Sequence, residues 1–270
     1  MASKMSELAS ASGPKEITGL GRTVSVALAA ILLCLFCSLS GRAQGGPPMI
    51  TDDTETVPKH HFEINSAFTV ERGSEGTLYA VPLVDFNYGL SKHTQLKVEM
   101  PWLIIHNSGQ VPINGLGNAN IGVRWRFRDE HEKHRIAMSI YPQLEFNVFQ
   151  SSVRRGIVDK APEFLLPLQW QTQVGKWGIN GDVGYRFKRG HDEMIYGVVV
   201  GRELNKRIEV LGEVHGEGPT NRIGEHAEIY NFGTRIGITS HATFLFSAGS
   251  SLRRHFDPNF IAYTGLQITF

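Results

Sequence analysis

The chain has 270 residues, of which 41% are hydrophobic and 20% are charged, and 29 are glycine. This composition is typical of a globular chain and excludes a disordered or fibrous protein. Lys and Arg number 27 against 26 Asp and Glu, which gives a formal net charge of +1. With that balance and no run of basic residues, the sequence gives no indication of a nucleic-acid partner.

The first segment, residues 1–43, is predicted to be a cleavable signal peptide. Basic residues precede the apolar run VSVALAAILLCLFCSLS, and Gly41 and Ala43 follow it. Small residues at these two positions are what a secretory peptidase requires for cleavage after Ala43. The alternative is a membrane anchor, although the run is at the short end for a helix that spans about 30 Å of hydrocarbon. Both cysteines lie in this run, so we expect no disulfide in the mature chain.

Residues 44–59 follow as a predicted soluble periplasmic lead-in. The stretch TDDTE at 51–55 carries carboxylates of the type that coordinate cations, but it is also typical of a solvated segment. Further along, HEKH at 131–134 is one residue short of the HExxH spacing of zinc enzymes and is predicted to be a solvated turn. We therefore expect no metal site and no cofactor.

From residue 60 onward, the dominant sequence period is two. In NIGVRWRFRD at 120–129, apolar side chains alternate with glycine and arginine. TQLKVEMPWLI at 94–104 and WGINGDVGYRFK at 177–188 alternate in a similar way. Successive side chains of a β-strand point to opposite faces, so each stretch predicts a strand with one apolar and one polar face.

About twelve such segments can be counted along the chain. They lie near 60–71, 77–88, 94–105, 117–128, 135–147, 163–174, 177–188, 194–204, 207–216, 227–238, 241–252 and 259–270. Short and long connections alternate between them, as expected for an antiparallel meander with one tight rim and one looped rim.

Two architectures share this alternation, because a soluble sandwich or lipocalin-like barrel turns its apolar face inward and an outer-membrane barrel turns it outward. Four features favour the membrane barrel. The polar face is rich in charge and glycine, aromatic residues gather near the predicted strand ends, the strand number is even, and the chain has an export signal and an apolar end. We therefore predict an all-β fold, a transmembrane antiparallel up-and-down β-barrel over residues 60–270.

The C-terminal stretch YTGLQITF predicts how such a barrel is assembled. Thr264, Leu266, Ile268 and Phe270 share one face of the last strand, and the chain ends on the aromatic residue. This pattern resembles the signal by which the assembly machinery of bacterial outer membranes recognises its barrels. We expect that machinery and outer-membrane lipid as partners, and a location in the outer membrane of a diderm bacterium after export through the periplasm.

Four quoted stretches also carry a family resemblance: GGPPMITDDTETVPKHHFEIN, LVDFNYGLSKHTQLKVEMPW, GLGNANIGVRWRF and YPQLEF. Together they resemble the outer-membrane barrels named for the meta-pathway of phenol degradation, over nearly the whole mature chain. The resemblance implies an outer-membrane location and a link to uptake of small compounds, with aromatic or other hydrophobic solutes as one class. The family has no motif of catalytic residues to transfer.

The predicted function is a channel or transporter for small solutes and not an enzyme. The enzymatic alternative, an outer-membrane lipase, needs a histidine-activated serine, and His106 and Ser108 in HNSG lack an evident orienting partner. A second alternative is a structural or adhesive barrel that carries no flux and acts through its extracellular loops.

The candidate pore-lining residues are the charged side chains of the polar face. They are Lys97, Glu99, Arg124, Arg126, Arg128, Glu145, Asp182, Arg186, Glu209, Glu213 and Arg235. Rows of opposite charge on neighbouring strands form cross-strand pairs. The sequence leaves open whether these pairs simply fill the lumen or form the wall of a selective pore.

Overall fold

The structure is a computed structural model that describes residues 45–130, 135–253 and 256–270. The predicted signal peptide and the HEKH turn lie outside the described residues. No described helix is long and apolar enough to cross a membrane.

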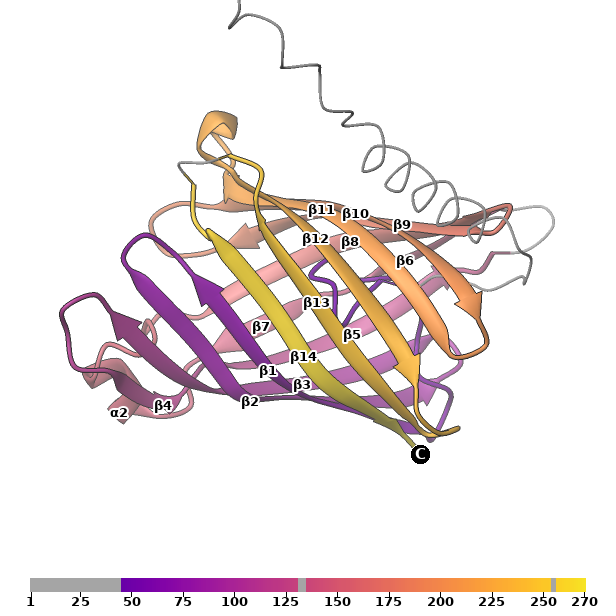
Figure 1. Cartoon of the computed structure of the whole chain (residues 1–270), viewed down its shortest axis with the longest axis horizontal. Coiled ribbons are helices and arrows are strands. Elements are labelled where there is room, and N and C mark those ends of the chain that lie inside the picture. Colours follow the sequence, from indigo (N-terminus) through magenta and orange to yellow (C-terminus); the bar gives the residue numbers. More distant parts are fainter. Residues whose placement is uncertain (1–44, 131–134, 254–255) are drawn as a thin grey trace, which may run out of the picture. The chain divides into compact units, whose positions relative to one another are not determined.

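The described chain is dominated by β-strands, with one short helix and one 3-10 turn (Figure 1). The strands are β1 (Phe62–Arg72), β2 (Gly76–Ser91), β3 (Thr94–Asn107), β4 (Ile113–Leu116), β5 (Ala119–Arg128), β6 (Ile136–Ile140), β7 (Gln143–Phe146), β8 (Glu163–Val174), β9 (Trp177–Phe187), β10 (Glu193–Asn205), β11 (Ile208–Pro219), β12 (Ala227–Gly237), β13 (Ala242–Ser251) and β14 (Phe260–Thr269). The helix is α2 (Gln150–Arg154) and the 3-10 turn is η1 (Ile223–Glu225).

The strands form one antiparallel sheet that closes on itself, because β1 pairs with β14 as well as with β2. Both β4 and β5 pair with β3, and both β6 and β7 pair with β8. β4 and β5 are therefore two parts of one interrupted barrel strand, and so are β6 and β7. Counted in this way, the barrel has twelve strands. The prediction of about twelve antiparallel strands is confirmed, and closure leaves no open strand edge to be solvated by lipid.

The apolar face of the sheet points outward. Val198 and Val214, which are opposite one another on β10 and β11, have 43% and 49% of their surface exposed. Gln169 and Asn231 point inward and are 0% and 1% exposed. A soluble barrel has the reverse arrangement, so the predicted membrane-barrel fold is confirmed.

The two ends of the barrel differ. The terminal rim is the end at which β1 begins and β14 ends, where the Phe62 amide donates to the Phe270 carbonyl at 3.1 Å. Tight turns at 92–93, 175–176 and 206–207 lie at this rim. The loop rim, at the other end, has longer connections, among them the one that contains α2. The predicted alternation of short and long connections is thus observed.

The aromatic residues follow the predicted strand ends only in part. Tyr88, Phe127 and Phe187 lie at or near the ends of β2, β5 and β9. Trp170 instead lies within β8, where its ring packs against Gly181 of the neighbouring strand. An aromatic side chain on the outer face can fill the space above a glycine. Sequence position alone does not distinguish such a residue from an aromatic residue at the membrane–water interface.

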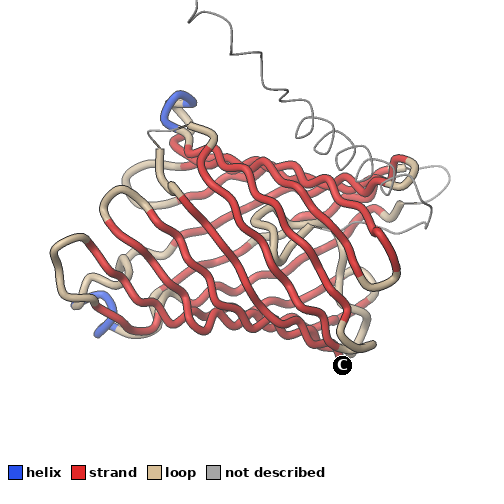
Figure 2. The backbone as a smooth tube through the Cα atoms, viewed as in Figure 1, coloured by secondary structure: helices blue, strands red, loops and turns tan. Residues whose placement is uncertain are grey.

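The segment before β1 lies inside the barrel. Residues 45–58, which we call the luminal segment, run between the walls in Figure 2 as an irregular trace without strand pairing. Thr51 and Thr54 are 0% exposed, and Asp53 is 6% exposed. The expectation of a soluble lead-in over residues 44–59 is therefore wrong for this part of the chain. The barrel wall supplies the hydrogen-bonding groups that solvent would otherwise supply.

The outward face gives a direct test of the membrane orientation. We expect Val198→Arg, in the middle of β10, to lower the free energy of unfolding by about 2–4 kcal/mol, because the guanidinium would be at the bilayer midplane. Leu90→Arg is the matched control near the end of β2, where the cost is about 0–1 kcal/mol. Denaturant unfolding in lipid vesicles measures both, and equal costs would contradict this orientation.

Candidate functional site: the luminal segment and its cavities

The luminal segment is held first by a carboxylate that binds its backbone. Glu213 of β11 accepts hydrogen bonds from the Ile50 amide at 3.1 Å and the Thr51 amide at 2.5 Å. The side-chain amide of Asn231 on β12 donates to the same carboxylate at 3.1 Å. Hydrogen bonds to a charged acceptor are stronger than neutral ones, so this contact fixes the turn at residues 50–51.

Polar side chains from β8 and β9 hold the next residues. The Asn180 side chain donates to the Asp52 carbonyl at 3.1 Å, and the Asp52 amide donates to Asp182 at 3.3 Å. The Thr54 hydroxyl donates to Gln171 at 3.1 Å. These contacts connect the segment to the wall on the side opposite β1.

Two arginines of β5 form ion pairs with the acidic stretch. Arg124 lies 2.7 Å from Asp52 and 3.4 Å from Asp53, and it also donates to the Glu55 carbonyl at 2.7 Å. Arg126 is 2.8 Å from the Glu55 carboxylate. Since Arg124 is only 6% exposed, the loss of either partner would leave an unpaired charge inside the barrel.

Arg235 of β12 binds the start of the segment. Its guanidinium donates to the carbonyls of Gly45, Gly46 and Pro47 at 2.5, 3.0 and 3.0 Å, respectively. It also pairs with Glu209 of β11 at 3.1 Å. Five guanidinium hydrogens in a fixed fork suit a cluster of carbonyl oxygens, which explains why an arginine occupies this position.

An apolar contact completes the docking of the segment. Met49 is 5% exposed and packs with Val199 and Leu211 of β10 and β11 in the lumen. Gly197 on β10 makes room for Thr51, because a Cβ at Gly197 would collide with the Thr51 hydroxyl. Glycine on the inner face therefore accommodates another part of the same chain, which the sequence alone did not predict.

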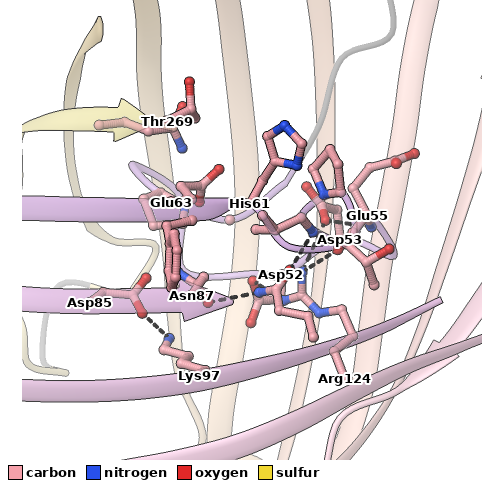
Figure 3. A pocket seen from close by; sticks show the side chains of 18 of the residues that line it. Asp52, Asp53, Glu55, His61, Glu63, Asp85, Asn87, Lys97, Arg124 and Thr269 are labelled. Carbon is pink, nitrogen blue, oxygen red and sulfur yellow. Dashed lines mark hydrogen bonds and ion pairs between the residues drawn. The ribbon is translucent and has the colours of Figure 1, made fainter. Parts of the chain in front are cut away.

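Cavity space remains in the lumen beside the luminal segment and, separately, toward the loop rim. The larger cavity, of about 620 Å³, reaches the terminal rim and is lined by the segment and by residues of β1, β2, β3 and β14 (Figure 3). The smaller cavity, of about 320 Å³, lies toward the loop rim. Its lining includes Glu99, Glu145, Asp159 and Glu163. The segment thus occupies part of the lumen and forms one wall of the larger cavity.

The structure places the predicted pore-lining residues on the inner face of the wall, with the exception of Arg128. A bulge between Arg126 and Arg128 sets Arg128 opposite Met138, which pairs with the outward-facing Trp170, so the prediction is wrong for this residue. Those that contact the luminal segment are Arg124, Arg126, Asp182, Glu213 and Arg235. The others contact residues of the wall. Three of them form ion pairs: Lys97 with Glu99 at 2.9 Å, Glu209 with Arg235, and Arg186 with Glu217 at 3.4 Å. Glu145 accepts a hydrogen bond from Asn118 at 2.9 Å, and Arg128 contacts Met138 at 4.0 Å. The predicted cross-strand pairing therefore exists, but the strongest contacts go to the luminal segment.

Sequence reasoning missed several residues of the site. Tyr141, at the break between β6 and β7, is 0% exposed and lies under Arg124, whose guanidinium carbon is 4.3 Å from the ring centre. His215 of β11 faces the lumen, where its ring nitrogen lies 3.3 Å from the Thr51 hydroxyl. His106 and Ser108 form no hydrogen bond with each other in the described structure.

Asp53 gives the luminal segment a predicted pH dependence. Burial raises the pKa of Asp53 to about 7, against the opposing effect of Arg124 and with support from Asp52 and Glu55. A carboxyl whose pKa is higher in the docked state stabilises docking at low pH, and that contribution is lost as the pH rises through about 7. We expect any conductance of the refolded chain in a planar bilayer to increase between pH 5.5 and 8.5.

The control for this pH effect is Asp53→Asn, which cannot ionise. The variant should show a flatter conductance profile across the same range, because its docking no longer depends on the ionisation of residue 53. If Asp53→Asn shows the same pH dependence of conductance as the wild type, the effect arises from other charges in the lumen.

Comparison with solved structures identifies the fold as that of outer-membrane channels. The COG4313 outer membrane channel from Pseudomonas putida F1 matches with a TM-score of 0.59 and 13% identity, over 81% of this chain and 98% of that one. The KdgM porin in complex with disordered oligogalacturonate matches with a TM-score of 0.55 and 11% identity, over 77% and 99%. The NanC porin matches with a TM-score of 0.55 and 9% identity, over 77% and 98%.

No family model matches the chain, and no curated protein sequence matches it significantly. The resemblance to the barrels named for the meta-pathway of phenol degradation is therefore not confirmed. At these identities the solved structures establish the fold, an outer-membrane-type β-barrel, and the function has to be argued from the lumen.

Proposed function

We propose that the chain is an outer-membrane channel for small polar solutes, and that the luminal segment controls the width of its pore. The observation that carries this proposal is the docking of residues 45–58 by charged wall residues, with a cavity beside the segment and a second cavity toward the loop rim. A segment held by hydrogen bonds and ion pairs can be displaced more readily than a packed apolar core. A wall of charged side chains suits hydrated solutes better than hydrophobic ones.

The predicted residues receive roles within this proposal. The luminal segment is held by Arg124, Arg126, Asp182, Glu213 and Arg235. Lys97, Glu99 and Glu145 line the cavities and select solutes by charge. The loop rim faces outward from the cell and the terminal rim faces the periplasm, as in bacterial barrels with short periplasmic turns. Thr264, Leu266 and Ile268 share one face of β14, and Phe270 follows the strand. In this proposal these four residues act as the assembly signal.

A swelling assay with proteoliposomes tests the proposed transport. Refolded chain should admit small neutral sugars and exclude larger oligosaccharides, and an aromatic solute of similar size should enter no faster than a sugar. No swelling with any solute, from a barrel shown to be folded by its heat-modifiable migration, would contradict the channel function. That result would instead favour the non-transporting barrel, which acts through its loops.

A further inference from the structure

The larger cavity contains two carboxylates that the docking of the luminal segment does not use. Glu63 on β1 and Asp85 on β2 both point into the lumen, and both line this cavity (Figure 3). The side-chain nitrogen of Asn65, which lies between them, donates to Glu63 at 3.2 Å and to Asp85 at 3.2 Å. One amide group thus holds the two carboxylates side by side.

These carboxylates have little compensating positive charge. Lys97 lies 3.8 Å from Asp85, but it is closer to Glu99, at 2.9 Å. Glu63 forms no ion pair with any other described residue. Asp85 is only 4% exposed, and its Oδ1 atom has no hydrogen-bond partner in the described structure. Arg124 and Arg235 also line the cavity, but among the described residues only Lys97 forms an ion pair with either carboxylate. Two carboxylates that share one such partner attract positive charge.

A second feature of the same cavity also lacks a partner. Tyr141 lines the cavity and is 0% exposed, and its hydroxyl makes no hydrogen bond within the described part of the chain. Buried polar groups in native proteins are nearly always hydrogen-bonded, and a tyrosine hydroxyl both donates and accepts. A buried hydroxyl without a partner, on a residue that lines a cavity, is available to a bound ligand.

We propose that this cavity binds a small solute that carries an ammonium group, with Glu63 and Asp85 as the acceptors and Tyr141 as a further hydrogen-bonding group. The inference rests on the proposed channel function and names cationic organic compounds as its solute class. The volume of about 620 Å³ lies within the usual range for small-molecule sites.

Three six-carbon polyols of different charge test this inference. Glucamine is cationic, sorbitol is neutral and gluconate is anionic at neutral pH, so they differ chiefly in charge at one end. Isothermal titration of the folded full-length mature chain in detergent should show binding of glucamine at least about tenfold tighter than sorbitol, since a charge-assisted hydrogen bond is worth about 1.5–3 kcal/mol. Equal binding of glucamine and sorbitol, or no glucamine binding, would overturn the inference.

Variants assign the binding to these carboxylates. Glu63→Gln and Asp85→Asn should each weaken glucamine binding about tenfold, because each replaces a charged acceptor with a neutral one. Asp85→Asn leaves Lys97 paired with Glu99, and both variants keep the size of the side chain. Glu203→Gln, on β10 and outside the cavity lining, is the matched control and should bind like the wild type. Wild-type affinity in Glu63→Gln would place the site elsewhere and overturn the inference.

The titration separates this inference from the channel function. Glucamine binding by a barrel that shows no liposome swelling would support the cation site and refute the channel. Swelling with sugars, in a protein that binds glucamine no better than sorbitol, would support the channel and refute the cation site.

Discussion

Replacing Arg124 with methionine is expected to release the luminal segment and raise the single-channel conductance several-fold. Arg124 pairs with Asp52 and Asp53 and donates to the Glu55 carbonyl, so the variant leaves buried carboxylates without a cation. Removing one partner of a buried ion pair typically costs about 3–5 kcal/mol, which is large compared with the stability of a short docked segment. The conductance of refolded chain in a planar bilayer measures the effect.

Arg186→Met is the matched control for this variant. Arg186 is also an inward arginine, but its ion pairs are with Glu163, Glu193 and Glu217 of the wall and not with the luminal segment. The control should keep the small wild-type conductance, although its ion selectivity changes. If both variants conduct alike, docking of the segment does not depend on Arg124 in the way that the contacts indicate.

Substituting Gly197 with alanine should displace the segment by a different physical effect. The added methyl group would occupy the place of the Thr51 hydroxyl, and overpacking of this kind costs about 1–3 kcal/mol. We expect a several-fold rise in conductance. Gly212→Ala is the control, because the nearest atom to its new Cβ is on the Phe232 ring at 3.5 Å, an ordinary contact.

A double variant shows whether the Gly197 effect acts through Thr51. Thr51→Ala removes the hydroxyl with which the new methyl group would clash. The double variant of Gly197→Ala and Thr51→Ala should therefore restore most of the wild-type conductance. Such non-additivity is the signature of direct contact between two positions. An additive result would mean that alanine at position 197 disturbs the wall itself and not the docked segment.

The barrel could be predicted because successive side chains of a strand point to opposite faces, which gives the sequence an apolar–polar period of two. The expected segment 135–147, for instance, covers both β6 and β7, and only the interruption at Tyr141 and Pro142 was not foreseen. The inward direction of Glu213 and Arg235 followed from the same alternation, because the apolar residue that follows each of them, Val214 or Ile236, faces outward.

The partners of those residues could not be predicted in the same way. The luminal segment has no periodic pattern, and its hydrogen bonds join positions far apart in the chain, such as Thr51 and Glu213 or Thr54 and Gln171. Many of them use backbone amides and carbonyls, which are the same in every sequence. The available signal was the acidic stretch TDDTE beside a barrel with inward arginines, and charge complementarity alone did not locate it in the lumen.

The most direct test of the proposed pore control is the single-channel conductance of residues 44–270 with and without residues 45–58. Both proteins should be shown to be folded by heat-modifiable migration before they are inserted into a planar bilayer. The intact chain should give small steps, and the chain without the luminal segment should give larger ohmic steps. Identical steps from the two folded proteins would contradict the conclusion that this segment sets the width of the pore.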